Sequence, residues 1–560
     1  MITTAPYGTW ASPISAADTV AGLVGFSEIA ADGDELFWLE MRPSEGGRQV
    51  LVRRSAAGEI SDLTPPPAHP RTLVHEYGGG ALVVESGEVI YSEFVDQRLY
   101  RVVADESVVV TAEPPRPRSI RYADGRVLPG ERLICVRETH PAEGEAVNEL
   151  VMVDLASGTS TMLASGRDFY SNPRPNSDGT ELVWLEWDHP NMPWDGTELK
   201  HGRLNGGELV DQTTLCGGDA ESIYQPEWDP AGRLVYVSDR SGWWNLYRYD
   251  GTTHQCLVDL AADFGEPAWV FGRSSFGFLS DGRILAGFWE DGIHRLGVVA
   301  PDGSFVRIED DLSDHGQLIT DGGSRAWFVA KGATTPAALV ELDVDTGERR
   351  IVRSNKQPVE AGHMSIPEII TFPTDDDETA HAVYYPPANP GFIGPEGERP
   401  PLIVQVHGGP TSHVYPRLSA GILFWTTRGF GVVDVNYRGS TAYGREFRNK
   451  LRDNWGIADV ADCLNAARYL AEQGKVDGDR LVITGGSAGG YTTLAALAFG
   501  DAFSAGASYF GVADLGLLAA HTHKFESRYL DGLVGTDPGV MKARSPLFSA
   551  DQISVPVALF

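Results

Sequence analysis

The amino-acid sequence predicts two domains, a β-propeller followed by an α/β-hydrolase domain. Residues from about 20 to 360 form short strand-like runs separated by turns, whereas the remainder alternates apolar strands with helices. A serine in a glycine-rich turn lies between one of those strands and the helix that follows it. The chain has 560 residues, of which 42% are apolar. This is enough for two or three domains of about 100–200 residues each.

The propeller is predicted from strand composition and from a recurring turn. The strand-like runs are rich in β-branched and aromatic residues, and clear examples are 35–40, 182–186, 234–238 and 284–288. A two-residue turn signal that ends in glycine precedes many runs, and it begins at Asp32, Ser86, Asp124, Asp178, Ala231, Asp281 and Asp321. Such pairs favour hairpins because glycine tolerates a positive φ. Their spacing of roughly 50 residues is the length of one four-stranded blade, so seven signals predict seven blades. The alternative is a generic all-β region with frequent turns.

The second domain is predicted from strands and helices that alternate along the chain. Apolar strands are expected at 402–407, 431–435, 480–484, 504–509 and 555–560, and helices at 459–473 and 490–497. This alternation implies a parallel sheet covered by helices. We place the propeller, with a short N-terminal extension, at residues 1–362 and the hydrolase domain at residues 363–560.

The strongest catalytic signal is the run Gly485-Gly486-Ser487-Ala488-Gly489. Small neighbours allow a sharp strand-to-helix turn that exposes a serine Oγ at a helix N-terminus. The run follows a predicted strand and precedes a predicted helix, which is the context that such a turn requires. We therefore expect Ser487 to be a catalytic nucleophile, the alternative being a glycine-rich turn without function.

A second signal is the run His407-Gly408-Gly409-Pro410, directly after an apolar strand. In α/β-hydrolases one oxyanion donor comes from this loop and the other from the residue after the nucleophile. We therefore assign the oxyanion hole to the N–H groups of Gly409 and Ala488. His407 itself is expected to make structural hydrogen bonds, because this fold delivers its catalytic histidine after the serine.

The acid and base of a catalytic triad are not evident in the sequence. In this fold both follow the serine, and the acid normally comes after the strand expected at 555–560. Neither an aspartate nor a histidine follows that strand. We therefore expect the hydrolase domain to be truncated at its C-terminus and the chain to be inactive as it stands. A triad of Asp514 with His521 or His523 is the alternative.

Several longer motifs carry a family resemblance, and they are found at 187–195, 238–247, 407–410, 436–440, 485–491 and 524–530. With these motifs the sequence resembles the prolyl oligopeptidase (S9) family of serine peptidases, in particular its acylaminoacyl-peptidase and dipeptidyl-aminopeptidase-like branch. The resemblance covers nearly the whole chain. It implies a propeller that caps the active site and admits short peptides, and hydrolysis through an acyl-enzyme at Ser487. It also implies an Asp and a Gly-His motif beyond the strand at 555–560.

Glu526 and Arg528 follow the strand after the predicted nucleophile, where a specificity pocket can form. We consider both for substrate contact, with structural ion pairing as the alternative. The sequence alone does not decide between acylated, free N-terminal and proline-directed substrates.

Composition excludes several other classes of function. The net charge of −32 argues against binding to nucleic acid or to an anionic membrane. The four cysteines are far apart, so neither a metal site nor a disulfide framework is expected, and no cofactor is implied. No signal peptide or apolar span is evident, which favours the cytoplasm. A homo-oligomer is left open.

Two further functions compete with an oligopeptide-cleaving serine peptidase. One is an esterase or an acylaminoacyl-releasing hydrolase with little peptidase activity. The other is a propeller that binds partners and has lost catalysis, which the missing triad members favour.

Overall fold

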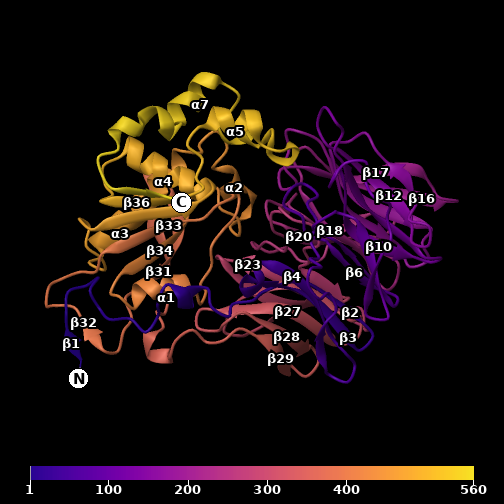
Figure 1. Cartoon of the computed structure of the whole chain (residues 1–560), viewed down its shortest axis with the longest axis horizontal. Helices are drawn as coiled ribbons and strands as arrows, with labels where there is room; N and C mark the ends of the chain where they lie inside the picture. Colours follow the sequence, from indigo (N-terminus) through magenta and orange to yellow (C-terminus); the bar gives the residue numbers. More distant parts are fainter. Residues whose placement is uncertain (1) are drawn as a thin grey trace.

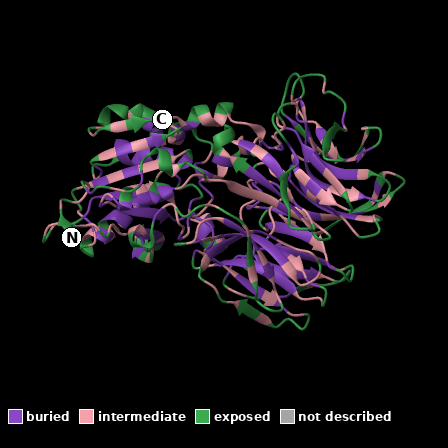
Figure 2. Cartoon of the chain, turned by 60° about the horizontal axis from the view of Figure 1, so that its bottom comes forward, coloured by how far each residue is buried: buried purple, intermediate pink, exposed green. Residues whose placement is uncertain are grey.

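The computed structural model describes residues 2–560 of the chain. Figure 1 shows two lobes side by side, a hydrolase lobe in orange and yellow and a propeller lobe in indigo to salmon. Both lobes have buried strands and exposed connecting loops, as Figure 2 shows. The two predicted domains are therefore present, and the predicted fold class is confirmed.

The propeller consists of seven four-stranded antiparallel sheets within residues 2–560. The first four blades are β2–β5 (Gly25–Asp32, Glu35–Arg42, Arg48–Arg54, Ile60–Asp62), β6–β9 (Leu82–Glu85, Glu88–Ser92, Leu99–Val103, Glu106–Val109), β10–β13 (Ile120–Leu128, Arg132–Thr139, Val147–Asp154, Ser160–Ala164) and β14–β17 (Phe169–Pro175, Glu181–Trp187, Thr197–Asn205, Glu208–Gly218). The other three are β18–β21 (Ile223–Trp228, Leu234–Ser238, Asn245–Tyr249, His254–Cys256), β22–β25 (Phe276–Phe278, Ile284–Glu290, Ile293–Val299, Phe305–Ile308) and β26–β29 (Leu312–Thr320, Arg325–Gly332, Ala338–Asp343, Arg349–Ser354). The predicted blade number of seven is confirmed.

One of the seven turn signals has a different role from the one expected. Six of them lie in the hairpin between the first and second strands of a blade, but Asp124 lies inside β10 at a register shift. Its buried carboxylate accepts hydrogen bonds from the Asn172 backbone N–H (2.6 Å) and from Arg174 Nη1 (3.0 Å) of the next blade. The hairpin of this blade turns instead at Gly130, where φ is +85°. Asp124 thus joins two blades rather than turning a hairpin.

The ring closes where the first blade packs on the last. Trp38 of β3 and Trp327 of β27 belong to one buried apolar cluster. Arg54 of the first blade donates to Glu341 of the last over 2.8 Å. Each of these two blades keeps its own four strands within residues 2–560, so side-chain packing closes the ring.

The hydrolase domain is built on a seven-stranded sheet within residues 2–560. Its strands, in spatial order, are β30 (Glu368–Pro373), β31 (Thr379–Tyr385), β34 (Gly431–Asn436), β33 (Leu402–Val406), β35 (Leu481–Gly486), β36 (Ala505–Tyr509) and β37 (Val557–Leu559). The pairs from β34 to β37 are parallel, as expected, whereas β30 and β31 add an antiparallel hairpin at one edge. The sequence analysis named no strand between residues 363 and 401, so this hairpin was not predicted.

Seven α-helices accompany this sheet within residues 2–560: α1 (Ala420–Thr426), α2 (Gly444–Asn449), α3 (Ala458–Glu472), α4 (Ala488–Phe499), α5 (Leu515–His521), α6 (Tyr529–Leu533) and α7 (Pro538–Arg544). Helix α4 is buried along nearly its whole length, and α2 lies on the side that faces the propeller (Figure 1). None of the helices in the described part has the length and apolar character that crossing a bilayer requires.

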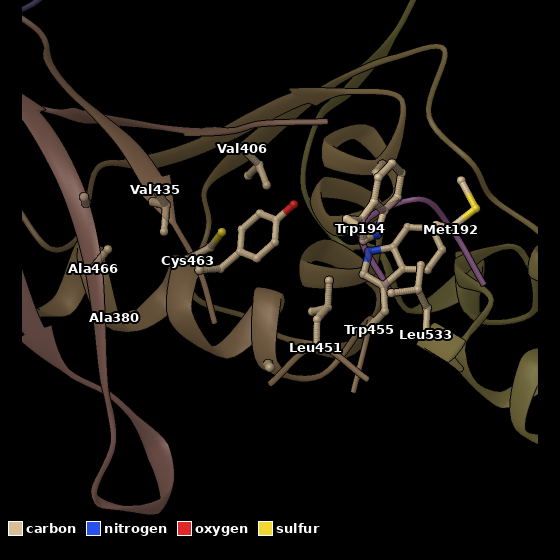
Figure 3. Close-up of a cluster of buried hydrophobic side chains, with 14 of the residues drawn as sticks. Met192, Trp194, Ala380, Val406, Val435, Leu451, Trp455, Cys463, Ala466 and Leu533 are labelled. Atoms are coloured by element: carbon tan, nitrogen blue, oxygen red, sulfur yellow. The ribbon is translucent and has the colours of Figure 1, made fainter. Parts of the chain in front are cut away.

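Apolar packing continues from one domain into the other. Figure 3 shows Met192 and Trp194 of the propeller beside Leu451, Trp455 and Leu533 of the hydrolase domain. All five belong to one buried cluster that also contains the core of the hydrolase sheet. The propeller is therefore docked on the hydrolase domain through a packed interface.

The N-terminal segment contacts the hydrolase domain rather than the propeller. Strand β1 (Thr3–Thr4) pairs in parallel with β32 (Phe392–Ile393), and the Trp10 ring stacks on Phe392 at 6.1 Å. The strands on either side of residue 362 belong to different sheets. A domain boundary at residue 362 remains our proposal.

Candidate functional site

Ser487 occupies a sharp turn between β35 and α4. Its φ of +54° and ψ of −120° are sparsely populated for a residue with a side chain, and such conformations cost about 1–3 kcal/mol. Its backbone N–H donates to the carbonyl oxygen of Tyr509 over 3.0 Å, which ties the turn to the neighbouring strand β36. The residue is exposed. The turn therefore presents the serine hydroxyl at the N-terminus of a buried helix.

The glycines around Ser487 are required by close contacts of the backbone. A Cβ atom at Gly485 would overlap the carbonyl of Gly489, and one at Gly489 would overlap the carbonyl of Val406. At Gly490 a Cβ would lie 2.6 Å from the Cα of Gly511. These contacts let α4 begin directly against strands β33 and β36. The sharp turn thus depends on residues without side chains at these positions.

The loop after β33 lies against the serine. A Cβ at Gly408 would lie 3.7 Å from the Cβ of Ser487, and Gly409 has a φ of +124°. Within residues 2–560, neither the Gly409 N–H nor the Ala488 N–H donates to a backbone or side-chain acceptor. Two backbone donors therefore remain available next to Ser487, one from the loop and one from the first residue of α4.

His407 is engaged in structural contacts and does not bond to Ser487. Its Nε2 lies 3.0 Å from Ser440 Oγ and its Nδ1 lies 2.8 Å from the carbonyl oxygen of Gly408. The ring also stacks on Tyr437 at 4.3 Å. Burial lowers the pKa of His407 to about 4, so the imidazole is neutral at pH 7.

The alternative triad residues have other partners. Asp514 caps α5 and accepts from the Leu517 N–H over 3.1 Å. The Nε2 atom of His523 lies 3.5 Å from Glu526. No hydrogen bond joins the Ser487 hydroxyl to a histidine or a carboxylate within residues 2–560. The described residues thus provide the serine and two N–H donors, but no base in contact with the serine.

Glu526 and Arg528, considered for substrate contact, are placed in different environments. The Tyr77 hydroxyl of the propeller donates to Glu526 Oε1 over 2.6 Å, so Glu526 faces the other domain. Burial and this carboxylate raise the pKa of Tyr77 well above its usual range. Arg528 lies 3.3 Å from Asp531, and its side chain is 59% exposed. Only Glu526 therefore lies between the domains, and sequence reasoning missed its partner Tyr77.

One cluster in the propeller has the donor types of a metal site. Ligand atoms of Glu76, Glu138 and His140 lie within 4.8 Å of one another. Arg121 Nη1 donates to Glu76 over 2.7 Å and to Glu138 over 3.2 Å. The guanidinium already supplies a positive charge to both carboxylates, so the cluster is accounted for as an ion-pair network.

Comparisons with known proteins agree with this architecture. Residues 416–560 match the prolyl oligopeptidase family. The chain is similar to the solved structure of a puromycin-hydrolysing peptidase of Mycobacterium tuberculosis, with 38% identity and a TM-score of 0.95, over 100% of this chain and 88% of that one. A puromycin hydrolase is equally similar, with 38% identity, a TM-score of 0.95 and coverage of 100% and 89%.

A curated relative is the dipeptidyl aminopeptidase BIII of Pseudoxanthomonas mexicana, with 26% identity over 74% of this chain and 61% of that protein. The chain thus spans about three fifths of the length of this relative. Since the match to the puromycin-hydrolysing peptidase covers most of both proteins at 38% identity, and the hydrolase domain matches the family directly, the chain belongs to the prolyl oligopeptidase family of peptidases.

Proposed function

We propose that the protein is a serine peptidase in which Ser487 attacks the scissile carbonyl of a short peptide. The observation that carries this proposal is the placement of Ser487, exposed at the start of α4 with two unpaired N–H donors beside it among the described residues. Serine Oγ forms a bond to the carbonyl carbon and gives its proton to a base. The C–N bond then breaks, the amine leaves with a proton, and water hydrolyses the resulting acyl-enzyme.

The oxyanion hole is assigned to Gly409 and Ala488. Negative charge develops on the carbonyl oxygen during attack, and two preorganised N–H groups stabilise it without reorganisation. The N-terminus of α4 adds a partial positive charge at the same place. Removal of one such donor typically costs about 2.7–4 kcal/mol of transition-state stabilisation.

Residues 1–560 by themselves are proposed to turn over peptides poorly. A serine without a base is a weak nucleophile at neutral pH, and no described histidine or carboxylate bonds to Ser487. Oxyanion-hole and binding effects alone leave roughly 10³–10⁴-fold acceleration over water.

Short peptides are the proposed substrates. The packed interface between propeller and hydrolase domain supports exclusion of folded proteins, since both domains contribute to one buried cluster. A serine-to-alanine variant of the related puromycin hydrolase was crystallised with PGG, which supports peptide ligands for this family. A cytoplasmic location remains our prediction, and a homo-oligomer is left open.

The substrate class can be decided with one panel. The complete gene product and its Ser487→Ala variant should be tested with matched peptides that carry an acylated N-terminus, a free N-terminus or an internal proline, and with a simple ester. Peptide turnover that Ser487→Ala loses supports the proposal. Ester turnover alone would favour an esterase, and cleavage restricted to acylated peptides would favour an acylaminoacyl-releasing enzyme. A complete product without Ser487-dependent turnover of any substrate would favour a binding propeller.

A further inference from the structure

The loop that carries Gly409 is held by residues of both domains. Within the hydrolase domain, the Tyr437 hydroxyl donates to the Pro410 carbonyl over 2.9 Å, and the Tyr529 hydroxyl lies 3.1 Å from the Thr411 N and 2.6 Å from its Oγ1. From the propeller, Trp269 Nε1 donates to the Thr411 carbonyl oxygen over 2.8 Å. Among residues 2–560 this is the single propeller hydrogen bond to residues 407–411.

The chain segment that carries Trp269 is hydrogen-bonded to another segment of the propeller. It belongs to the long connection between β21 and β22, in which the Phe271 N–H donates to the Gly78 carbonyl over 3.0 Å. Gly79 and Phe271 form a parallel bridge, and a Cβ at Gly79 would lie 2.8 Å from the Phe271 nitrogen. The glycine run at 78–80 therefore lets this segment approach closely the connection that carries Trp269, at Phe271.

Aromatic neighbours fix the orientation of the Trp269 ring. Its centroid lies 4.5 Å from Trp194, 5.3 Å from Tyr77 and 5.6 Å from Tyr529. Tyr77 and Trp194 come from the propeller, whereas Tyr529 comes from α6 of the hydrolase domain. The indole N–H is thus aimed at Thr411 by packing from both domains.

We infer that Trp269 is a positioning residue through which the docked propeller holds the proposed oxyanion donor Gly409 in place. Thr411 is two residues from Gly409, and the backbone between them includes Pro410, whose ring limits its freedom. A displaced Thr411 carbonyl therefore displaces the Gly409 N–H. This inference rests on the proposed function, and it predicts that the loop is fully ordered only while the propeller is docked.

The most direct test is amide hydrogen exchange of the loop in the 560-residue chain, which needs no catalytic activity. Trp269→Phe removes the indole N–H and keeps an aromatic ring. Trp228→Phe is the matched control, because it removes an indole hydrogen bond to the Arg174 carbonyl oxygen elsewhere in the propeller and leaves the loop and Trp269 untouched. We expect peptides spanning residues 407–418 to exchange at least about fivefold faster in Trp269→Phe and to stay within about twofold of wild type in Trp228→Phe. Equal exchange in the two variants would overturn the inference.

Kinetics of the complete gene product give a second readout. Loss of an oxyanion donor lowers kcat by about 10²–10³-fold, and a misplaced donor costs less. Trp269→Phe is therefore expected to lower kcat about tenfold with KM within about twofold, whereas Trp228→Phe leaves both within about twofold. If Ser487→Ala is inactive and Trp269→Phe keeps its kcat, the inference is wrong and the proposed function stands. If Ser487→Ala retains turnover, the proposed function is wrong, while the exchange result still decides whether Trp269 holds the loop.

Discussion

Nη2 of Arg448 in α2 lies 2.7 Å from the carboxylate of Asp239 in the propeller, and both side chains are buried. Arg445 reaches the same carboxylate over 2.5 Å, and the Arg448 guanidinium lies 4.1 Å from the centre of the Trp244 ring. One buried carboxylate thus receives two guanidinium groups from the other domain. These charges are desolvated, so each is stable in the interface only when its partner compensates it. Removal of one partner would leave a buried charge uncompensated and would weaken the interface.

Removal of the Asp239 carboxylate is expected to destabilise the protein strongly. Asp239→Ala leaves two guanidinium groups without their partner, one of them buried, and breaking a buried pair costs about 3–5 kcal/mol. Arg452→Ala is the control, since Arg452 is 47% exposed and its bond to Asp195 is screened by solvent. Urea unfolding should show a large loss of stability for Asp239→Ala and a change below about 1 kcal/mol for Arg452→Ala. Similar stability of the two variants would refute this account of the interface.

A methyl group at Gly489 is expected to disrupt the turn that carries Ser487. The added Cβ would overlap the carbonyl of Val406 in the central strand β33, which cannot move without distorting the sheet. Overpacking of this kind costs about 1–3 kcal/mol or more. The matched control is Gly421→Ala in α1, where the nearest atom to the new Cβ is Ser419 Oγ at 3.7 Å. Thermal unfolding of both variants checks the prediction, and an unchanged Tm for Gly489→Ala would contradict it.

The buried His407 is expected to make the protein less stable in mild acid. Its folded pKa is about 4, whereas an unfolded histidine has a pKa of about 6.5. The unfolded chain therefore binds more protons between these values, so stability is complete above about pH 6.5 and falls as the pH drops towards 4. In His407→Gln this contribution is absent. The unfolding free energy of wild type should then decline more steeply than that of the variant, by up to about 1.4 kcal/mol per pH unit.

The buried Asp459 changes stability with pH in the opposite direction to His407, because burial raises the pKa of its carboxyl to about 6. It takes up a proton in the folded state as the pH falls, which offsets part of the loss from histidine. This effect is common to wild type and His407→Gln, so it cancels when their slopes are compared. Parallel curves between pH 6.5 and 4 would show that His407 is not held neutral.

Features set by neighbouring residues could be predicted from the sequence, whereas contacts between distant residues could not. The turn at Ser487 was expected because its glycines, the preceding strand and the following helix are contiguous. Asp124 was misplaced because an Asp-Gly pair suits both a hairpin and a bulge, and only the contact with Arg174 of the next blade distinguishes them. The bond from Trp269 to Thr411 joins residues 142 positions apart, and no local pattern indicates such a pair.

Chemical labelling of Ser487 tests the central claim most directly. The complete gene product should be treated with a fluorophosphonate, and the modified residue should be located by mass spectrometry. The account predicts a single adduct on Ser487, with no labelling of the Ser487→Ala variant. Equal labelling of that variant, or an adduct on another residue, would contradict the assignment of Ser487 as the nucleophile.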